Sequence, residues 1–345
     1  MAKRALKKKT LSFDDLKKKF SSRVKYKEQQ FFDLGKTFQE VCGIAGPAMG
    51  QINMFLGHSD TGKTTALIKS AVDAQKKNIL PVFLITEQKW SFEYAKLLGF
   101  DCEQKVDEET GELYWDGFFI DKVGFNYIEQ AFDYITELLD AQEKGDLPYD
   151  LLFLWDSIGT IPCEMSFNGK GGNQHTARVI SEKWGMGLAQ RITSSRKEDS
   201  PHTNTMVFVN QPWVQIPEGF GQKPKIMPKG GNSIFLSSAL VFLFGNQANA
   251  GTSRITATTG GKKITFATRT KVGVTKNHIN GISYADRLLV TPHGFILDTP
   301  NEVKQYKQDY SDYWDVLLDG SSTEATLEEE TVIGTPVIVT GKRSA

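Results

Sequence analysis

Cysteine is scarce in this sequence, and long hydrophobic runs are absent. The cysteines, Cys42, Cys102 and Cys163, are scattered without CxxC spacing, which argues against a disulfide framework or a zinc site and fits a reducing compartment. No window approaches about eighteen consecutive apolar residues, so we expect no membrane span. The N-terminus, MAKRALKKKT, is basic but has no apolar stretch behind it, so we expect a cytoplasmic protein that is not secreted.

A net charge of zero conceals an asymmetry along the chain. The first 27 residues are basic, whereas the segment STEATLEEE near the C-terminus is acidic. A basic arm suits nucleic acid, a membrane surface or an acidic neighbour, and equally a solvated tail. Within the arm, Phe13, Leu16 and Phe20 share one helical face, and Ser12 is suited to the N-cap. A helix this short needs a packing partner, either its own core or a neighbouring subunit.

Strand-like and helix-like segments alternate from residue 50 to about residue 298. Apolar runs such as QINMFLG, ILPVFLITE, DLLFLWDS and TMVFVNQ are separated by amphipathic segments such as NYIEQAFDYITELLDAQEKG. This alternation predicts an α/β fold with a mostly parallel, twisted sheet flanked by helices. The closing run of strand-like segments has little helix within it, which predicts antiparallel strands added at one edge. Residues after about 320 have few apolar side chains and are expected to be disordered.

The segment GHSDTGKTT, residues 57–65, lies between a strand-like and a helix-like run. Its pattern, Gly-x-x-x-x-Gly-Lys-Thr, is typical of loops that hold a nucleoside triphosphate. Glycines let the backbone approach phosphate oxygens, while backbone N–H groups and the helix N-terminus face the anion. Lys63 is expected to offset phosphate charge and Thr64 to ligate Mg²⁺. The alternative is a glycine-rich turn with a surface lysine.

Two carboxylates follow strand-like runs. Asp156 ends the apolar run LLFLWD, where an acidic side chain is unfavourable without a polar task, so we assign it to the metal. Glu87 ends VFLITE, and the carboxyl ends of strands in open α/β sheets face the ligand crevice. Glu87 is therefore our candidate for the base that positions water. The alternatives are an Asp in a turn and an exposed Glu at a strand end.

The order of these segments resembles the core of RecA-type recombinases over roughly residues 33–298. GHSDTGKTT is followed by VFLITE, EYAKLLG, FLWDS, VFVNQ, a loop, GGN and TRTKVGVTKNH, and the pattern is closest to the UvsX-like phage branch. The resemblance implies a RecA-like P-loop ATPase core over residues 33–300 with two DNA-binding loops. Outside this core, the residue patterns predict a basic arm over residues 1–32, which we expect to serve oligomerisation, a C-terminal helix over 301–320 and a disordered tail over 321–345. Because the segment EVKQYKQDYSDYWDVLLDG suits a single helix, we expect no compact C-terminal domain like that of cellular RecA.

The resemblance also assigns roles in the nucleotide site. Tyr94 would stack on adenine, although a tyrosine on an amphipathic helix is more often a core residue. Gln211, directly after the run MVFV, would sense the γ-phosphate and report to the loop that follows. The residues expected to contact the cofactor are Gly57, His58, Ser59, Asp60, Thr61, Gly62, Lys63, Thr64, Thr65 and Tyr94. Thr64 and Asp156 are expected to serve the metal. Glu87, Lys63 and Gln211 are expected to serve catalysis.

Two loops would carry DNA. Residues 162–175 are rich in Gly and Asn without an apolar period, and residues 212–232 combine prolines, glycines, lysines and large apolar side chains. Lysines can meet a single-stranded backbone while apolar side chains stack on bases, although a mobile surface loop is the alternative. The candidate DNA contacts are Met165, Phe167, Lys170, Arg178, Trp213, Ile216, Phe220, Lys223, Lys225, Lys229, Gly230, Gly231 and Asn232.

Lys276 and His278 lie where the family usually places two lysines that reach the ATP of the next subunit. His278 departs from that pattern, because histidine is fully charged only below about pH 6.5 unless it is perturbed. Hydrolysis could therefore be weaker, pH-dependent or reliant on Lys276 alone.

The resulting prediction is a DNA-dependent ATPase, acting in a bacterial or phage-infected cell, with ATP and Mg²⁺ as cofactors. It would form helical homo-oligomers on single-stranded DNA, pair with homologous duplex DNA and exchange strands, with a single-strand-binding protein and a loading mediator as further partners. One alternative is a RecA-fold helicase or motor, which normally has an arginine finger and a separate N-terminal domain. Another is a non-catalytic mediator or scaffold, against which Glu87 argues.

Overall fold

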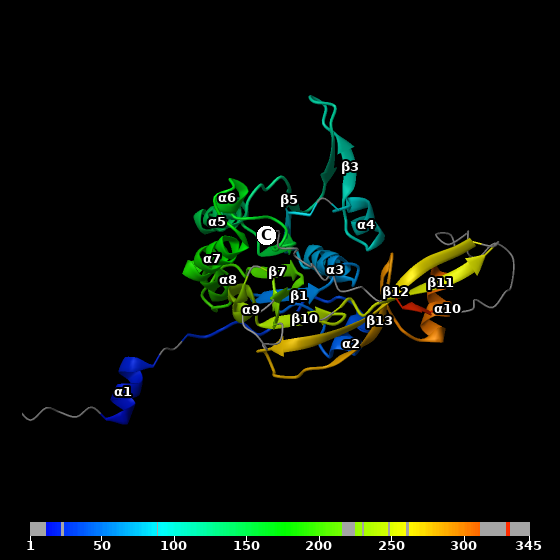
Figure 1. Cartoon of the computed structure of the whole chain (residues 1–345). Helices are drawn as coiled ribbons and strands as arrows, with labels where there is room; N and C mark the ends of the chain where they lie inside the picture. The colour runs from blue at the N-terminus through cyan, green and yellow to red at the C-terminus, as the bar shows by residue number, and fades with distance from the viewer. Residues whose placement is uncertain are drawn as a thin grey trace, which may run out of the picture.

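The computed structural model describes residues 12–21, 24–87, 89–215, 225–229, 231–247, 249–259, 262–310 and 329–331. A large sheet lies at its centre, with helices on both faces and smaller elements projecting from it (Figure 1). None of the described helices is both long and apolar enough to cross a membrane.

The central sheet has the strand order β14-β13-β12-β10-β1-β7-β6-β2-β5. Its strands are β1 Ile52–Gly57, β2 Leu80–Ile85, β5 Ile120–Lys122, β6 Leu151–Asp156, β7 Thr205–Asn210, β10 Leu240–Phe244, β12 Lys262–Asn277, β13 Ala285–Thr291 and β14 Gly294–Leu297. Neighbours from β10 to β5 are parallel, whereas β12, β13 and β14 are antiparallel to their neighbours. The predicted fold class, a mostly parallel sheet with antiparallel strands at one edge, is confirmed.

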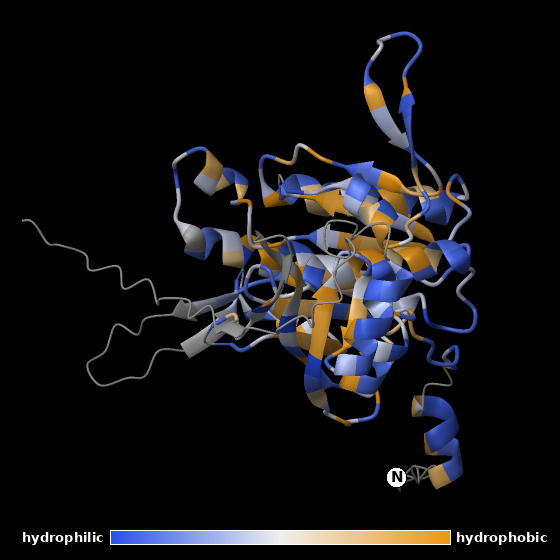
Figure 2. Ribbon diagram, turned by 90° about the vertical axis from the view of Figure 1, so that its right-hand side faces the viewer, coloured by the Kyte–Doolittle hydropathy of each residue, from blue (hydrophilic) through white to orange (hydrophobic). Residues whose placement is uncertain are grey.

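Alternate side chains of the central strands enter two separate cores. On β1, Phe55 packs into one core, while Met54 and Leu56 pack into the other. All six residues of β1 are buried, as expected for a strand covered by helices on both faces. Figure 2 shows the apolar strands enclosed by helices whose polar sides face outward.

Each core is closed by its own set of helices. Helices α2 (Lys36–Cys42), α3 (Lys63–Lys76) and α4 (Phe92–Leu97) contribute to the first core. Helix α5 (Ile128–Lys144), helix α7 (Asn173–Lys183), the π-helical turn η1 (Trp184–Leu188), helix α8 (Ala189–Ser194) and helix α9 (Asn232–Ser237) contribute to the second. The long amphipathic segment that predicts a helix near residue 130 corresponds to α5.

Two hairpins project from the central sheet (Figure 1). One consists of β3 (Glu103–Val106) and β4 (Leu113–Asp116), which the sequence patterns do not predict. The other consists of β11 (Ser253–Thr259) and the first half of β12. A small separate core beneath the second hairpin contains Phe266 of β12 and Tyr306 of α10 (Pro300–Asp309).

The segments outside the core differ in part from expectation. Helix α1 (Phe13–Phe20) forms behind an N-cap at Ser12 and has no buried residue. Residues 1–11 of the expected basic arm lie outside the described residues. Within the C-terminal helix expected over residues 301–320, the structure has α10 over Pro300–Asp309, and residues 311–320 lie outside the described residues. Within the tail expected to be disordered, Glu329–Thr331 form β15 against β11, because the outer edge of β11 offers unpaired backbone groups to an extended segment.

A buried asparagine fixes the approach to the phosphate loop. Asn53, fully buried on β1, accepts a hydrogen bond from the backbone N–H of Ala48 (2.9 Å) and donates one to its carbonyl (3.0 Å). The same amide donates to the carbonyl of Met206 on β7 (3.3 Å). The loop before β1 is thus tied to the sheet through one side chain.

Asn53→Leu should destabilise the protein by about 2–4 kcal/mol, because it removes the partners of buried backbone groups at nearly constant volume. The measurement is urea unfolding followed by circular dichroism without nucleotide. Asn301→Leu, on the exposed side of α10, is the matched control and should change stability by less than about 0.5 kcal/mol. Equal midpoints for Asn53→Leu and wild type would contradict this role.

Candidate nucleotide site and adjacent loops

The loop between β1 and α3 has the geometry that its sequence motif predicts. Gly62 adopts φ +95°, and a Cβ there would meet the Val290 side chain at 2.8 Å, so both backbone and space favour glycine. The Thr61 hydroxyl donates to the carbonyl of His58 (2.9 Å) and closes the loop. Helix α3 begins directly afterwards at Lys63, so its N-terminal N–H groups face the space above the loop.

Lys63 is buried in this loop. Its side chain is 7% exposed, and its ammonium donates to the carbonyl of His58. Burial lowers the pKa of Lys63 to about 8, while the charges of Asp156, Glu87 and Asp60 act in the opposite direction. A phosphate anion would compensate the desolvated ammonium, so the loop fits such a ligand.

Thr64 and Asp156 meet where α3 begins and β6 ends. The Thr64 hydroxyl donates to Asp156 Oδ2 (2.8 Å), and Asp156 is 5% exposed. The pKa of Asp156 is raised to about 6, chiefly by burial and also by the nearby Glu87 charge, while the Thr64 hydrogen bond and the Lys63 charge act in the opposite direction. A buried carboxylate beside a hydroxyl fits a hard cation with oxygen ligands, such as Mg²⁺.

Glu87 lies two residues beyond β2 and is held against the end of β6. Its backbone N–H donates to the carbonyl of Asp156 (3.2 Å), and its carboxylate accepts a hydrogen bond from the Ser157 hydroxyl (2.9 Å). Thr86 is tied to the same place through a bond from its hydroxyl to the Ser157 carbonyl (2.8 Å). These bonds hold the Glu87 carboxylate at the carboxyl edge of the sheet.

These side chains line one cavity of about 240 Å³, which we call the phosphate crevice. The residues lining the phosphate crevice are Ser59, Asp60, Lys63, Thr64, Glu87, Lys89, Trp90, Tyr94, Asp156, Val209 and Gln211. The structure therefore brings together Lys63, Thr64, Asp156, Glu87 and Gln211, which come from four separate segments. Sequence reasoning missed Lys89, Trp90 and Val209. Lys89 and Trp90 lie two and three residues after Glu87 and could have been included by extending the strand-end argument.

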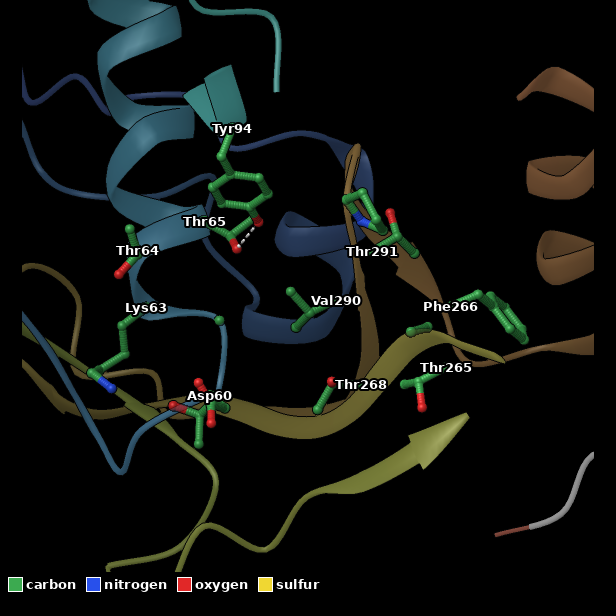
Figure 3. Close-up of a pocket in the computed structure, with 14 residues that line it drawn as sticks. Asp60, Lys63, Thr64, Thr65, Tyr94, Thr265, Phe266, Thr268, Val290 and Thr291 are labelled. Atoms are coloured by element: carbon green, nitrogen blue, oxygen red, sulfur yellow. Dashed lines mark hydrogen bonds between the residues drawn. The ribbon is translucent and has the colours of Figure 1, made fainter. Parts of the chain in front are cut away.

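A second cavity of about 390 Å³ adjoins the crevice and shares Asp60, Lys63, Thr64 and Tyr94 with it (Figure 3). We call it the lateral cavity. Tyr94 points from α4 toward the start of α3, where its hydroxyl lies 2.7 Å from that of Thr65. The opposite wall contains residues that sequence reasoning missed: Thr265, Phe266, Ala267, Thr268, Val290, Thr291 and Pro292. These residues belong to β12 and to the segment around the end of β13, and only the fold shows that they face the start of α3.

The first predicted DNA loop is more ordered than expected. It contains helix α6 (Glu164–Phe167), and α7 already begins at Asn173. The loop is stabilised where the backbone N–H of Cys163 donates to the Thr176 hydroxyl (3.0 Å). Met165 and Phe167 are 48% and 55% exposed, and Lys170 is exposed beside them. Arg178 lies on α7, where its guanidinium is bonded to Glu182 (2.7 Å) at the surface.

The second predicted DNA loop is closed at its base by a hairpin. Strands β8 (Pro212–Gln215) and β9 (Lys225–Pro228) pair in antiparallel fashion. Trp213 is 50% exposed, and Asn232 begins α9 with an exposed side chain. Gly231 adopts φ +89°, and a Cβ there would lie 3.4 Å from that of Ala177 on α7, so the ends of the two loops are neighbours. Four of the candidate residues lie outside the described part of the chain: Ile216, Phe220, Lys223 and Gly230.

Two lysines of the second loop differ in how they are placed. Lys225 belongs to β9, but its side chain is not part of the described structure. Lys229 is half-buried, and its ammonium donates to Gln211 Oε1 (3.1 Å). The structure thus places this lysine on the crevice residue Gln211, whereas the sequence suggests a contact with DNA.

Lys276 and His278 lie at the end of the central strands opposite to the phosphate loop, which we call the opposite edge of the sheet. Asn277 of β12 pairs with Leu240 at the start of β10, whereas Gly57 pairs with Phe244 at its end. The Lys276 ammonium donates to the carbonyls of Phe235 and Leu236 (2.7 and 2.8 Å) at the end of α9. His278 is exposed, and its backbone N–H donates to Ala239. Neither side chain serves the phosphate loop of its own chain.

Comparison with curated proteins finds matches to several proteins named RecA. The chain is 24% identical to Protein RecA of Desulforapulum autotrophicum over 243 residues, covering 69% of this chain and 58% of that protein. It is 25% identical to Protein RecA of Petrotoga mobilis over 182 residues, covering 52% and 42%, and 27% identical to that of Francisella tularensis subsp. novicida over 203 residues, covering 57% and 47%.

The matches are distant and partial. The chain spans about half of the length of the curated relatives that it matches. No family model matches the sequence. The sheet with its flanking helices and the phosphate loop between β1 and α3 fits a RecA-like core. Together, the fold and the matches to RecA proteins support the RecA family for this chain.

Proposed function

We propose that this protein is an ATP-dependent homologous-recombination protein that polymerises on single-stranded DNA, pairs it with homologous duplex DNA and exchanges strands. The observation that carries this proposal is the phosphate crevice, where Lys63, Thr64, Asp156 and Glu87 meet Gln211 at the start of the second loop. A phosphate site connected to an exposed loop can link nucleotide state to DNA binding. The RecA matches support the same function.

The residues of the crevice divide the chemistry among them. Lys63 offsets phosphate charge, and the N-terminus of α3 supplies N–H groups. Thr64 and Asp156 would hold Mg²⁺, and the bound ion would offset charge on the phosphates. Glu87, oriented by Ser157, would accept a proton from the water that attacks the terminal phosphorus, while the bond from that phosphorus to the ADP oxygen breaks. Tyr94 and the lateral cavity receive the adenosine part of ATP.

The two edges of the sheet support polymer formation. Lys276 and His278 lie opposite the phosphate loop of their own chain, so a head-to-tail neighbour is needed for them to reach a nucleotide. Helix α1 leaves Phe13 and Phe20 77% and 72% exposed, and docking on a neighbouring subunit would cover them. In this proposal, residues 1–32 form the oligomerisation arm and residues 33–300 the ATPase core.

The loops support single-stranded DNA as the polymer template. Exposed Met165, Phe167 and Trp213 offer apolar surfaces for bases, and Lys170 offers a cation for the backbone. A UvsX-like phage protein, assisted by a single-strand-binding protein and a loading mediator, is the more specific form of this proposal.

Measuring ATP turnover with and without single-stranded DNA, together with electron micrographs, tests the function. Strong stimulation and helical filaments support the recombinase. Rings that unwind duplex DNA would instead identify a motor of the same fold, and DNA binding without turnover would identify a mediator or scaffold.

The affinity for ATPγS should fall as the pH rises through about 8, the lowered pKa of Lys63. Above that pH the buried side chain is neutral and must take up a proton before it can offset phosphate charge, so the Kd should rise about tenfold between about pH 7 and pH 9. Lys63→Arg keeps its charge and should flatten this dependence even if it binds more weakly. A Kd for wild type that does not change with pH would contradict the assignment.

Glu87→Gln should slow ATP hydrolysis by about 10²-fold or more, the usual scale for loss of a positioned base, while ATP and DNA binding persist. Filaments should consequently remain on DNA longer. Glu112→Gln removes an exposed carboxylate from the projecting hairpin and should hydrolyse ATP like wild type. Normal turnover in Glu87→Gln would place the base elsewhere.

The double substitution Lys170→Ala and Lys225→Ala should weaken DNA binding irrespective of sequence. Each lost phosphate contact removes about 0.7 from the log–log salt slope on single strands, so the slope should fall by about 1.4. Lys36→Ala with Lys271→Ala removes the same charge from other surfaces and should leave the slope unchanged. If both double variants behave alike, the loops do not hold the DNA backbone.

A further inference from the structure

Gln211 and Lys229 lie side by side at the base of the second loop, one before it and one near its end. The backbone N–H of Lys229 donates to the carbonyl of Gln211 (3.0 Å), and the Asn210 amide donates to the carbonyl of Lys229 (3.0 Å). Directly beyond them, Pro212 and Pro228 are opposite one another in the β8–β9 hairpin. The position of Lys229 is therefore fixed relative to Gln211 by the backbone and does not depend on the rest of the loop.

The side chain of Lys229 is also held. Its ammonium donates to Gln211 Oε1 (3.1 Å), and its stem lies against Gly159, shortly after β6. A Cβ at Gly159 would meet Lys229 Cβ and Cδ at 2.7 and 2.8 Å, so the absence of a side chain there makes room for the lysine. This close packing favours the direction that brings the ammonium to Gln211.

The contact determines which end of the Gln211 amide remains available. An ammonium has only donors, so the amide atom facing Lys229 must be the oxygen. The NH₂ group is then left for the phosphate crevice, which Gln211 lines. Phosphate oxygens only accept hydrogen bonds, so the NH₂ group is the end of the amide that can bind them. The reverse orientation would present an oxygen to an anion.

We propose that Lys229 is a positioning residue that fixes the amide orientation of Gln211, so that Gln211 can donate a hydrogen bond to the terminal phosphate of the bound nucleotide. This inference rests on the proposed function, in which Gln211 senses that phosphate. It assigns Lys229 a task inside the crevice in place of the DNA contact that its sequence position suggests.

The same contact makes nucleotide and loop interdependent. Lys229 lies near the C-terminal end of the second loop. If that end moves away from Gln211, the Gln211 side-chain amide becomes free to rotate. Conversely, a phosphate that holds the NH₂ group favours the orientation that keeps Lys229 in place. By linkage, the two events stabilise each other to the same extent.

The test compares the affinities of the full-length protein for ATPγS and ADP in Mg²⁺ without DNA, because their ratio isolates the terminal phosphate. Gln211→Ala should lower the ratio about tenfold or more, the scale of a hydrogen bond to a charged group. Lys229→Met should lower it about three- to tenfold, since the amide loses its preferred orientation but not its donor. Lys229→Arg, which keeps a cationic donor, should restore most of the ratio, and Lys271→Met, exposed on β12, should leave it unchanged.

The double variant distinguishes positioning from a general structural effect. If Lys229 acts through Gln211, then adding Lys229→Met to Gln211→Ala should produce no further loss in the ratio. A normal ratio in Lys229→Met together with a low ratio in Gln211→Ala would overturn the inference while leaving the proposed function intact. A further loss in the double variant would also overturn it. If Gln211→Ala itself behaves like wild type, phosphate sensing by Gln211 fails, and the inference fails with it.

Discussion

The hydrogen bond from Thr64 to Asp156 joins the two halves of the candidate site. Thr64 belongs to the first turn of α3 and Asp156 to the last residue of β6, two strands away from β1 in the sheet. Asp156 is buried and Thr64 is partly buried, so the bond gives the buried carboxylate a partner that compensates part of its lost solvation. The same place receives the Glu87 backbone and the Lys63 ammonium, so the charges of the crevice share one desolvated environment. Loss of solvation in that environment lowers the pKa of the Lys63 ammonium and raises the pKa of the Asp156 carboxyl group.

The direction of the strands separates the molecule into two functional edges. Parallel strands place all their carboxyl ends at the same edge, where β1, β2, β6 and β7 present the crevice residues. The antiparallel strand β12 returns to the other edge and carries Lys276 and His278 there. In the proposed head-to-tail filament, the edge that carries Lys276 and His278 would face the phosphate crevice of a neighbouring subunit.

The two loops follow β6 and β7, and their ends lie close together. Gly231 lies against Ala177, and Lys229 lies against Gly159 and Gln211, so small residues allow the loop ends to approach each other and the crevice. Among the described residues of the loops, exposed Phe167 belongs to helix α6 and exposed Trp213 to strand β8. In the proposed function, nucleotide and DNA would be coupled over a distance of only a few residues, through hydrogen bonds and packing.

The sequence by itself determined the fold class and most residues of the phosphate crevice, because both depend on local patterns. Apolar runs alternating with amphipathic segments predict α3, α5 and the parallel strands, and the glycine-lysine-threonine motif predicts the loop before α3. The β3–β4 hairpin was missed because its strands are short and largely exposed, so they carry no apolar period. The wall of the lateral cavity and the contact between Lys229 and Gln211 join residues 18 or more positions apart in sequence. Only the tertiary structure decided these features, because the pairing of distant strands, rather than any local preference, determines which side chains face one another.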